Sequence, residues 1–254
     1  MGREGLPSLL IRGAVSVPSW FLAGAITFFS FLLILAVYLV RLWVDPDQRR
    51  IHGITSLWAR ALVTLAGARV RVFGREHLPR GRACILMANH QSYTDIPVLY
   101  SIRRHFKWVA DEALFQIPVL GWSMRMAGYV PIRRGDPHKG LKALEKARGW
   151  LAKGVSILVF PEGTRSRTGA LGRFQTGGFR LAVTSGTPIV PMVVIGTRQF
   201  LPRGSWLLRL GRRVQIHILP AVPPSPSARE VRPLANRVKT QMAQAYRRHL
   251  QHLR

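Results

Sequence analysis

The chain has 254 residues, which is enough for one sizeable core and a membrane attachment. It carries 38 Lys and Arg residues against 11 Asp and Glu residues, a formal net charge of +27. The basic residues form no tract and accompany no zinc-knuckle or RNP-like pattern, which argues against nucleic-acid binding. They suit an anionic membrane surface, or reflect an arginine-rich genome. The single cysteine, Cys84, excludes an intramolecular disulfide and a cysteine-based metal cluster.

The N-terminal segment contains an apolar run without charge between Arg12 and Arg41. About 20 apolar residues suffice to cross the core of a bilayer, and Trp20 and Trp43 bracket the run as interfacial residues do. The run is too long for a cleaved signal peptide, and no small-residue cleavage site follows it. We expect a membrane-anchoring helix at about residues 18–43, either spanning the bilayer or dipping into one leaflet.

A second, amphipathic helix is expected at about residues 51–67. Arg60 interrupts its apolar positions, so this helix should lie on the membrane or pack on the following domain rather than span. Together, residues 1–67 form the predicted N-terminal anchor. The larger basic load beyond it favours a cytoplasmic position for the rest of the chain.

From Arg69 onward, short β-like runs alternate with helical ones. This pattern predicts an α/β fold, a mixed sheet flanked by helices, over residues 68–220. Residues 221–254 should form a Pro-rich linker and an amphipathic helix, whose apolar stripe either packs on the core or contacts the membrane surface. The strand candidates are residues 69–73, 83–88, 107–110, 128–132, 155–160, 189–195 and 213–219.

His90 follows the apolar run 83–88 and precedes Asp95 by five positions. Because the run predicts a buried strand, His90 should emerge at its C-terminal edge, where α/β folds bind ligands. A short turn can fold the Asp95 carboxylate onto one ring nitrogen and leave the other free to accept a proton. Alone, this spacing is weak evidence, since it recurs by chance. Ser92 is expected to make a turn hydrogen bond rather than to act as a nucleophile.

Three further blocks follow the His-x4-Asp block at residues 90–95. They are Gly-Tyr-Val-Pro-Ile-Arg-Arg at 128–134, Phe-Pro-Glu-Gly-Thr-Arg-Ser at 160–166 and Pro-Ile-Val-Pro-Met-Val-Val at 188–194. Four blocks in this order resemble the motifs of the glycerolipid acyltransferase family, and most closely those of its 1-acyl-sn-glycerol-3-phosphate acyltransferases. The resemblance covers roughly residues 70–200, and its most specific part is the combination of His-x4-Asp with Pro-Glu-Gly-Thr-Arg-Ser.

The resemblance implies a membrane-bound enzyme of phospholipid biosynthesis. It would transfer a fatty acyl group from acyl-CoA or acyl carrier protein to the sn-2 hydroxyl of 1-acyl-glycerol-3-phosphate and form phosphatidic acid. The thioester is a co-substrate, and neither a cofactor nor a metal is expected. The expected partners are membrane lipids, the lysolipid acceptor and the acyl donor, with no nucleic acid. The expected location is a bacterial inner membrane, with the catalytic domain on its cytoplasmic face.

The same resemblance assigns roles to individual residues. His90 would take the proton of the acceptor hydroxyl, and Asp95 would fix the tautomer of its ring. Arg165 would bind the acceptor phosphate, while Glu162 would hold Arg165 or bind a glycerol hydroxyl. The full set of predicted substrate-binding residues is Arg134, Glu162, Gly163, Thr164, Arg165 and Ser166.

Two departures from the family pattern leave the acceptor open. Arg133 stands where an acid is common, and Phe174-Gln175-Thr176-Gly177 stands where Phe-Lys-Lys-Gly is common. Fewer lysines weaken the case for a strongly anionic head group, so another lysolipid, such as lyso-ornithine lipid, is an alternative acceptor. A non-catalytic lipid-binding protein would have little reason to keep His90 and Asp95 together. A hydrolase is disfavoured because no Gly-x-Ser-x-Gly elbow is present.

Overall fold

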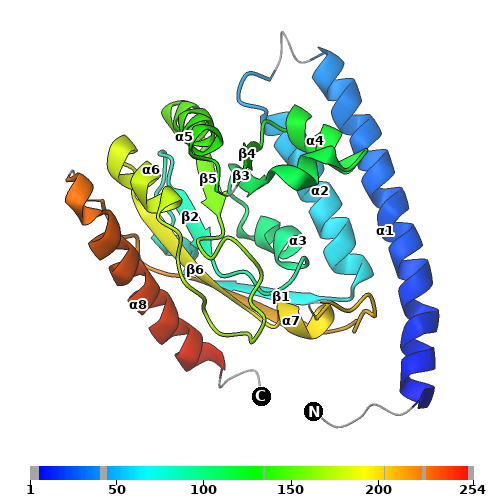
Figure 1. The fold of residues 1–254 in the computed structure, drawn as a ribbon. Coiled ribbons are helices and arrows are strands. Elements are labelled where there is room, and N and C mark those ends of the chain that lie inside the picture. The colour runs from blue at the N-terminus through cyan, green and yellow to red at the C-terminus, as the bar shows by residue number, and fades with distance from the viewer. Residues whose placement is uncertain (1–5, 41–44, 134, 203, 225–226, 251–254) are drawn as a thin grey trace.

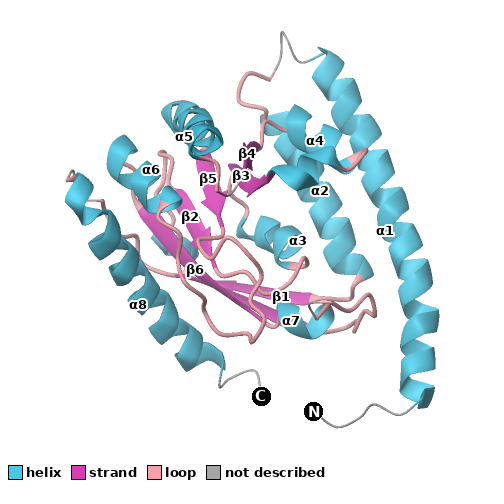
Figure 2. Ribbon diagram, viewed as in Figure 1, coloured by secondary structure: helices cyan, strands magenta, loops and turns pink. Residues whose placement is uncertain are grey.

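The fold was analysed in a computed structural model, which describes residues 6–40, 45–133, 135–202, 204–224 and 227–250. One twisted sheet runs through the centre, with helices on both of its faces (Figure 1, Figure 2). The mixed α/β architecture expected from the sequence is therefore confirmed.

The sheet has seven strands in the order β1-β7-β6-β2-β5-β3-β4. Neighbouring strands are parallel except β6 and β7, which pair antiparallel. β2, β5 and β6 are buried along their whole length, as expected for apolar runs covered on both faces. The strands are β1 Arg69–Phe73, β2 Ile85–Ala88, β3 Phe106–Asp111, β4 Val130–Ile132, β5 Ser156–Val159, β6 Ile189–Ile195 and β7 Arg213–Ile218, one for each predicted run.

Two groups of helices cover the sheet. Side chains from one group of helices form a core cluster with Leu86, Trp108 and Val194 of the sheet. Side chains from the other group form a second core cluster with Met87 and Val159. Because neighbouring residues of a strand point to opposite faces, the two clusters lie on opposite sides of the sheet. The first group comprises α1 Leu6–Val40, α2 Arg49–Leu65, α3 Asp95–Leu99, α4 Leu120–Met126 and α7 Thr197–Phe200, and the second α5 Pro137–Ala152, α6 Gly177–Ser185 and α8 Val231–Leu250.

Short 3₁₀ turns connect several of these elements. They are η2 Arg75–His77, η3 Tyr100–Ile102, η4 Glu112–Gln116 and η5 Ala228–Glu230.

Helix α1 is longer than the sequence predicted at its N-terminal end, since it begins at Leu6 rather than near residue 18. It lies along the domain (Figure 1): the Trp20 indole donates to the Trp206 carbonyl at 2.8 Å, and the Phe31 ring packs on Trp122. The part from Arg12 to Val40 is long and apolar enough to cross a membrane. Trp43, the second of the two tryptophans predicted at the membrane interface, lies outside the described residues.

Helix α2 begins where the Asp45 carboxylate accepts the backbone N–H groups of Arg49 at 2.7 Å and Arg50 at 3.1 Å. A carboxylate at this position accepts backbone N–H groups that have no partner within the helix, and its negative charge complements the helix dipole. Its buried side chains, Ile51 and Ala59 among them, join the core under the first sheet face. Helix α2 therefore packs on the domain, one of the two positions expected for it.

Helix α8 carries the apolar stripe predicted near the C-terminus. Leu234, Val238 and Met242 are fully buried against the second sheet face, whereas Leu250 at the end is exposed. The stripe therefore packs on the core, and α8 is a fixed part of the fold.

His52 on α2 is half-buried beside aromatic residues of the first core cluster and is held neutral there. Its ring lies 5.1 Å from that of Phe106 and 4.8 Å from that of His105. Burial, together with the nearby His105 and Lys107, lowers the pKa of His52 to about 3. The unfolded chain binds this proton near pH 6.5. Stability is therefore unaffected above about pH 6.5 and is lost as the pH falls toward the folded pKa.

We expect the free energy of unfolding to decrease between about pH 6.5 and 4, by up to about 1.4 kcal/mol per pH unit from this histidine. His52→Phe keeps an aromatic ring and removes the titration, so its pH dependence should be shallower. Urea unfolding followed by tryptophan fluorescence across this range measures the slope. His138→Phe, at an exposed histidine of α5, is the control for replacing a histidine with an aromatic ring. Identical slopes for His52→Phe and the wild type would contradict this account.

Candidate active site

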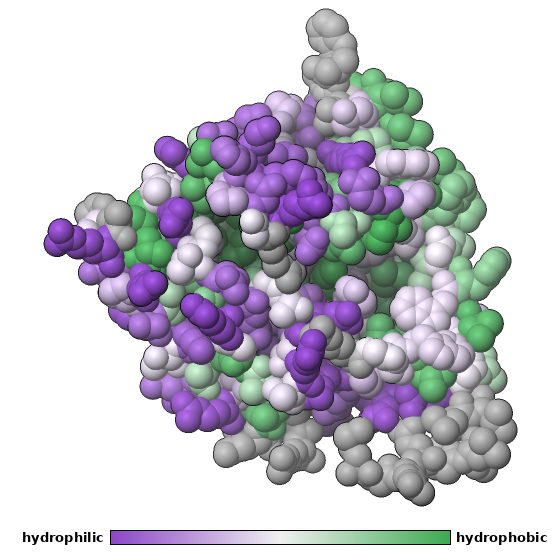
Figure 3. All heavy atoms as spheres, in the orientation of Figure 1, coloured by the Kyte–Doolittle hydropathy of each residue, from purple (hydrophilic) through white to green (hydrophobic). Residues whose placement is uncertain are grey.

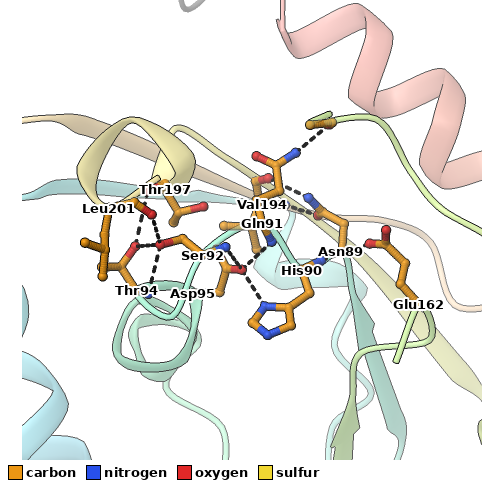
Figure 4. A network of polar contacts seen from close by, with 11 residues as sticks. Asn89, His90, Gln91, Ser92, Thr94, Asp95, Glu162, Val194, Thr197 and Leu201 are labelled. Atoms are coloured by element: carbon orange, nitrogen blue, oxygen red, sulfur yellow. Dashed lines mark hydrogen bonds and ion pairs between the residues drawn. The ribbon is translucent and has the colours of Figure 1, made fainter. Parts of the chain in front are cut away.

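The site begins where strand β2 ends. The Asn89 side chain donates to the Val194 carbonyl at 2.9 Å and accepts the Val194 N–H at 2.7 Å. This amide continues the pairing of β2 with β6 for one more residue, and it does so inside the core, where Asn89 is fully buried. His90 is thereby placed just beyond the C-terminal edge of the sheet, as the sequence predicted (Figure 4).

Asp95 turns back onto His90 across a short turn. The His90 Nδ1 and one Asp95 carboxylate oxygen are 2.7 Å apart. The same oxygen accepts the backbone N–H groups of Gln91 at 2.6 Å and Ser92 at 2.9 Å. Since a carboxylate oxygen in this setting accepts, Nδ1 carries the proton and Nε2 presents a lone pair. Two residues that the sequence singled out are thus joined as expected.

The ring plane of His90 is fixed by stacking. Its centroid lies 3.9 Å from that of Phe160, with the two rings nearly parallel at 8°. The side chain is 13% exposed, and within the described part of the chain Nε2 has no hydrogen-bond partner. His90 lines a large open cavity, so this nitrogen is available to a bound molecule.

Ser92 does not face the histidine. It is fully buried, its hydroxyl donates to the Leu201 carbonyl at 2.9 Å, and it accepts the Thr94 N–H at 3.3 Å. The second contact is the turn hydrogen bond that the sequence predicted. A hydroxyl held in this way, between the turn and the end of α7, is not placed for attack on a substrate.

Glu162 supports the site from the turn that follows the neighbouring strand β5. One oxygen accepts the His90 N–H at 3.0 Å and the other accepts the Gly172 N–H at 2.8 Å. Burial raises the pKa of this carboxyl, and the two backbone hydrogen bonds oppose that rise. The carboxylate therefore ties the histidine backbone to the loop that follows β5, a role that the sequence did not predict.

Arg165 lies over the face of Tyr93, with its guanidinium carbon 3.6 Å from the ring centroid. Such stacking contributes about 0.5–1 kcal/mol at an exposed site. Both residues line the cavity together with His90 and with Gly163, whose φ of +70° suits a residue without a Cβ. A cation is therefore held at the wall of the cavity that His90 also lines.

The other predicted binding residues are placed differently. Thr164 is exposed and lines the cavity. The Ser166 hydroxyl donates to the Ala170 carbonyl at 2.7 Å and accepts the Gly169 N–H at 2.9 Å, so it is engaged within its own loop. Arg134 lies outside the described residues, and its predicted role stays a prediction.

The cavity has a volume of about 1980 Å³ and is mostly apolar. Helices α1 to α4 line one side of the cavity, with residues that include Gly24, Thr27 and Ile96. Helices α5 and α6 line the other side, with residues that include Ala147 and Leu181. These helices cover opposite faces of the sheet, so the cavity passes over the sheet edge that carries His90. Figure 3 shows apolar side chains in the hollow of this face.

Comparison with known proteins identifies the family of this domain. The family model described as Acyltransferase matches residues 69–195. The chain belongs to this acyltransferase family. The matched part includes β1 to β6 and all the described site residues, whereas α1, α2 and α8 lie outside it.

Individual relatives agree with this assignment. The chain is 38% identical over 195 residues to the chloroplastic 1-acyl-sn-glycerol-3-phosphate acyltransferase LPAT1 of Arabidopsis thaliana, covering 75% of this chain and 54% of that protein. It is 32% identical over 182 residues to 1-acyl-sn-glycerol-3-phosphate acyltransferase of Pseudomonas aeruginosa, covering 70% of each. The alignments span about half to two thirds of the length of the first three curated relatives, 47% to 64%.

A solved structure shares the acyltransferase fold. The crystal structure of the 1-acyl-sn-glycerophosphate acyltransferase PlsC from Thermotoga maritima superposes with a TM-score of 0.80 at 27% identity. The match covers 94% of this chain and 96% of that one, so it extends beyond the family domain into the N- and C-terminal helices.

Proposed function

We propose that the chain is a membrane-bound 1-acylglycerol-3-phosphate O-acyltransferase that forms phosphatidic acid. The observation that carries this proposal is the His90–Asp95 pair, whose free Nε2 opens into a large apolar cavity. A histidine oriented by a buried carboxylate, beside a Ser92 hydroxyl that is buried and engaged with Leu201, suits direct acyl transfer between two lipid-like substrates. The curated relatives named as 1-acyl-sn-glycerol-3-phosphate acyltransferases support the choice of reaction.

In this mechanism, His90 Nε2 takes the proton from the acceptor hydroxyl as its oxygen attacks the thioester carbonyl carbon. A C–O bond forms, the C–S bond breaks, and the imidazolium returns its proton to the leaving thiolate. Asp95 holds the ring and stabilises the imidazolium. General-base assistance of this kind is worth about 10²–10⁴-fold. A thioester is already activated, so the proposal invokes acyl-CoA or acyl carrier protein as co-substrate and no further cofactor.

The acceptor phosphate is assigned to Arg165, with Gly163 and Thr164 beside it and Arg134 as a second cation. A guanidinium stacked on Tyr93 at the lining of the cavity suits a phosphate. The second candidate acceptor is another lysolipid, such as lyso-ornithine lipid. The neutral side chains of Gln175 and Thr176 line the same cavity and favour it, because they supply no charge for a phosphate.

The size of the cavity supports an enzyme with two lipid-like substrates. Sites for drug-sized ligands have volumes of about 300–1,000 Å³, and this cavity has about 1980 Å³. Lining residues on both sheet faces provide apolar surface for an acyl chain on each side of His90.

The membrane assignment rests on α1, whose outward residues include Phe21 and Phe29, 81% and 64% exposed. We propose that this surface contacts lipid and brings the cavity, which α1 helps to line, within reach of membrane-borne substrates. The basic surface of the domain suits anionic lipid on the cytoplasmic face of a bacterial inner membrane.

His90→Ala should lower kcat for phosphatidate formation by about 10²–10⁴-fold, because the acceptor hydroxyl loses its base. The measurement is acyl transfer from radiolabelled acyl-CoA or acyl carrier protein to lysophosphatidate by detergent-solubilised protein. His138→Ala, at the exposed histidine of α5, should retain the wild-type rate. A His90→Ala protein that kept the wild-type rate would refute the assigned base.

Arg165→Gln should raise the KM for lysophosphatidate about tenfold or more, since a charge-assisted hydrogen bond is worth about 1.5–3 kcal/mol. The KM for the acyl donor should change little. The exposed Arg167, two residues further along the chain, provides the control, and Arg167→Gln should leave both constants near wild type. If wild-type protein acylates only phosphate-free lysolipids, the reaction stands and the acceptor is the alternative one.

A further inference from the structure

The C-terminal helix reaches the catalytic turn through one hydroxyl. Tyr246 lies on α8, outside the segment that the family model matches. Its hydroxyl oxygen is 2.7 Å from Gln91 Nε2. Gln91 follows His90 directly in sequence and is 4% exposed, so this is a polar contact inside the protein between elements 155 residues apart.

Gln91 connects three parts of the site at once. Its backbone N–H donates to the Asp95 carboxylate at 2.6 Å, and its side-chain Nε2 donates to the Gly169 carbonyl at 2.8 Å as well as to Tyr246. A carbonyl only accepts, so the contact with Gly169 fixes which end of the amide is nitrogen. Both N–H groups of the amide are thereby used, one for each partner.

Gly169 belongs to the loop that carries the binding block. That loop is also attached to the histidine by the Ser166 N–H, which donates to the His90 carbonyl at 2.8 Å, and to α7 by Arg198, which donates to the Arg167 carbonyl at 2.9 Å. The Gln91 amide therefore helps to set the position of the Arg165 loop relative to the His90–Asp95 turn.

Tyr246 is itself held in place by the helix that carries it. Leu234, Val238 and Met242 of α8 are fully buried against β6 and α6. A buried amide with one fixed partner has fewer orientations than a free one, so the hydroxyl restrains Gln91 and, through it, the carboxylate that orients the base.

We propose that Tyr246 is a positioning residue for acyl transfer, which holds Gln91 so that the catalytic turn and the Arg165 loop keep their relative placement. This role rests on the proposed function, and it makes α8 part of the active-site scaffold. Tyr246 touches no substrate; it acts through Gln91.

The test compares Tyr246→Phe with Gln241→Leu. The first removes one hydroxyl from α8. The second removes a hydrogen bond from the same helix to the Pro220 carbonyl, away from the site. Tyr246→Phe should lower kcat about fivefold, in line with one hydrogen bond, while Gln241→Leu should leave it within the error of wild type. The midpoints of thermal unfolding are measured for both, and kcat is compared at a temperature where both are folded.

A double-mutant cycle with Gln91→Met separates positioning from general stability. In the Gln91→Met background, Tyr246→Phe should have no further effect on kcat, because the amide that it restrains is gone. Independent, multiplicative losses, or an unaltered kcat in Tyr246→Phe, would overturn the proposal. If Tyr246→Phe does not fold, Tyr246→His, which can still present a polar atom to Gln91, must retain more activity than Tyr246→Leu.

Failure of the proposed function would look different. In that case, wild-type protein would transfer no acyl group to lysophosphatidate or to other lysolipids. Wild-type activity that depends on His90 but not on Tyr246 would remove only the positioning role.

Discussion

The arrangement of the site depends on one buried carboxylate oxygen. Asp95 accepts at this oxygen from the His90 ring, the Gln91 N–H and the Ser92 N–H, all at 2.6 to 2.9 Å. These contacts close the turn after β2 and hold the imidazole in one tautomer. Three side chains contact this turn from outside it. Phe160 stacks on the His90 ring, Glu162 accepts the His90 N–H, and the Tyr246 hydroxyl accepts from the Gln91 amide. The cavity, which residues on both sheet faces line, is also lined by this histidine.

The sequence predicts the strands well because most are short apolar runs, and some of these, such as 155–160 and 189–195, are bounded by Gly or Pro. It does not predict their order. The pairing of β1 with β7 joins Arg69 to Arg213, and no local pattern specifies contacts over such a separation. The start of α1 was predicted too late because polar residues precede the dense apolar run. Those residues are used in packing: the Ser16 hydroxyl accepts the Leu208 N–H at 2.9 Å.

In the site, the same distinction between local and distant contacts decides what was predictable. His90 and Asp95 are five residues apart, so a turn brings them together without help from the rest of the fold. The contact of Glu162 with His90 joins residues 72 apart in sequence, and that of Gln91 with Tyr246 joins residues 155 apart. A carboxylate bound to two backbone N–H groups leaves no sequence pattern. The family motif pointed to Glu162 as a functional residue, whereas its contact with the His90 backbone emerged only from the fold.

The central claim is that His90 drives direct transfer without an acyl-enzyme. The most direct test is the intact mass of the protein after incubation with acyl thioester alone, and then with lysophosphatidate added. The account predicts unmodified protein in the first step and phosphatidate formation in the second. The Ser92 hydroxyl supports direct transfer, because it is buried and donates to the Leu201 carbonyl instead of facing His90. A stoichiometric acyl adduct that disappears into product when the acceptor is added would contradict it.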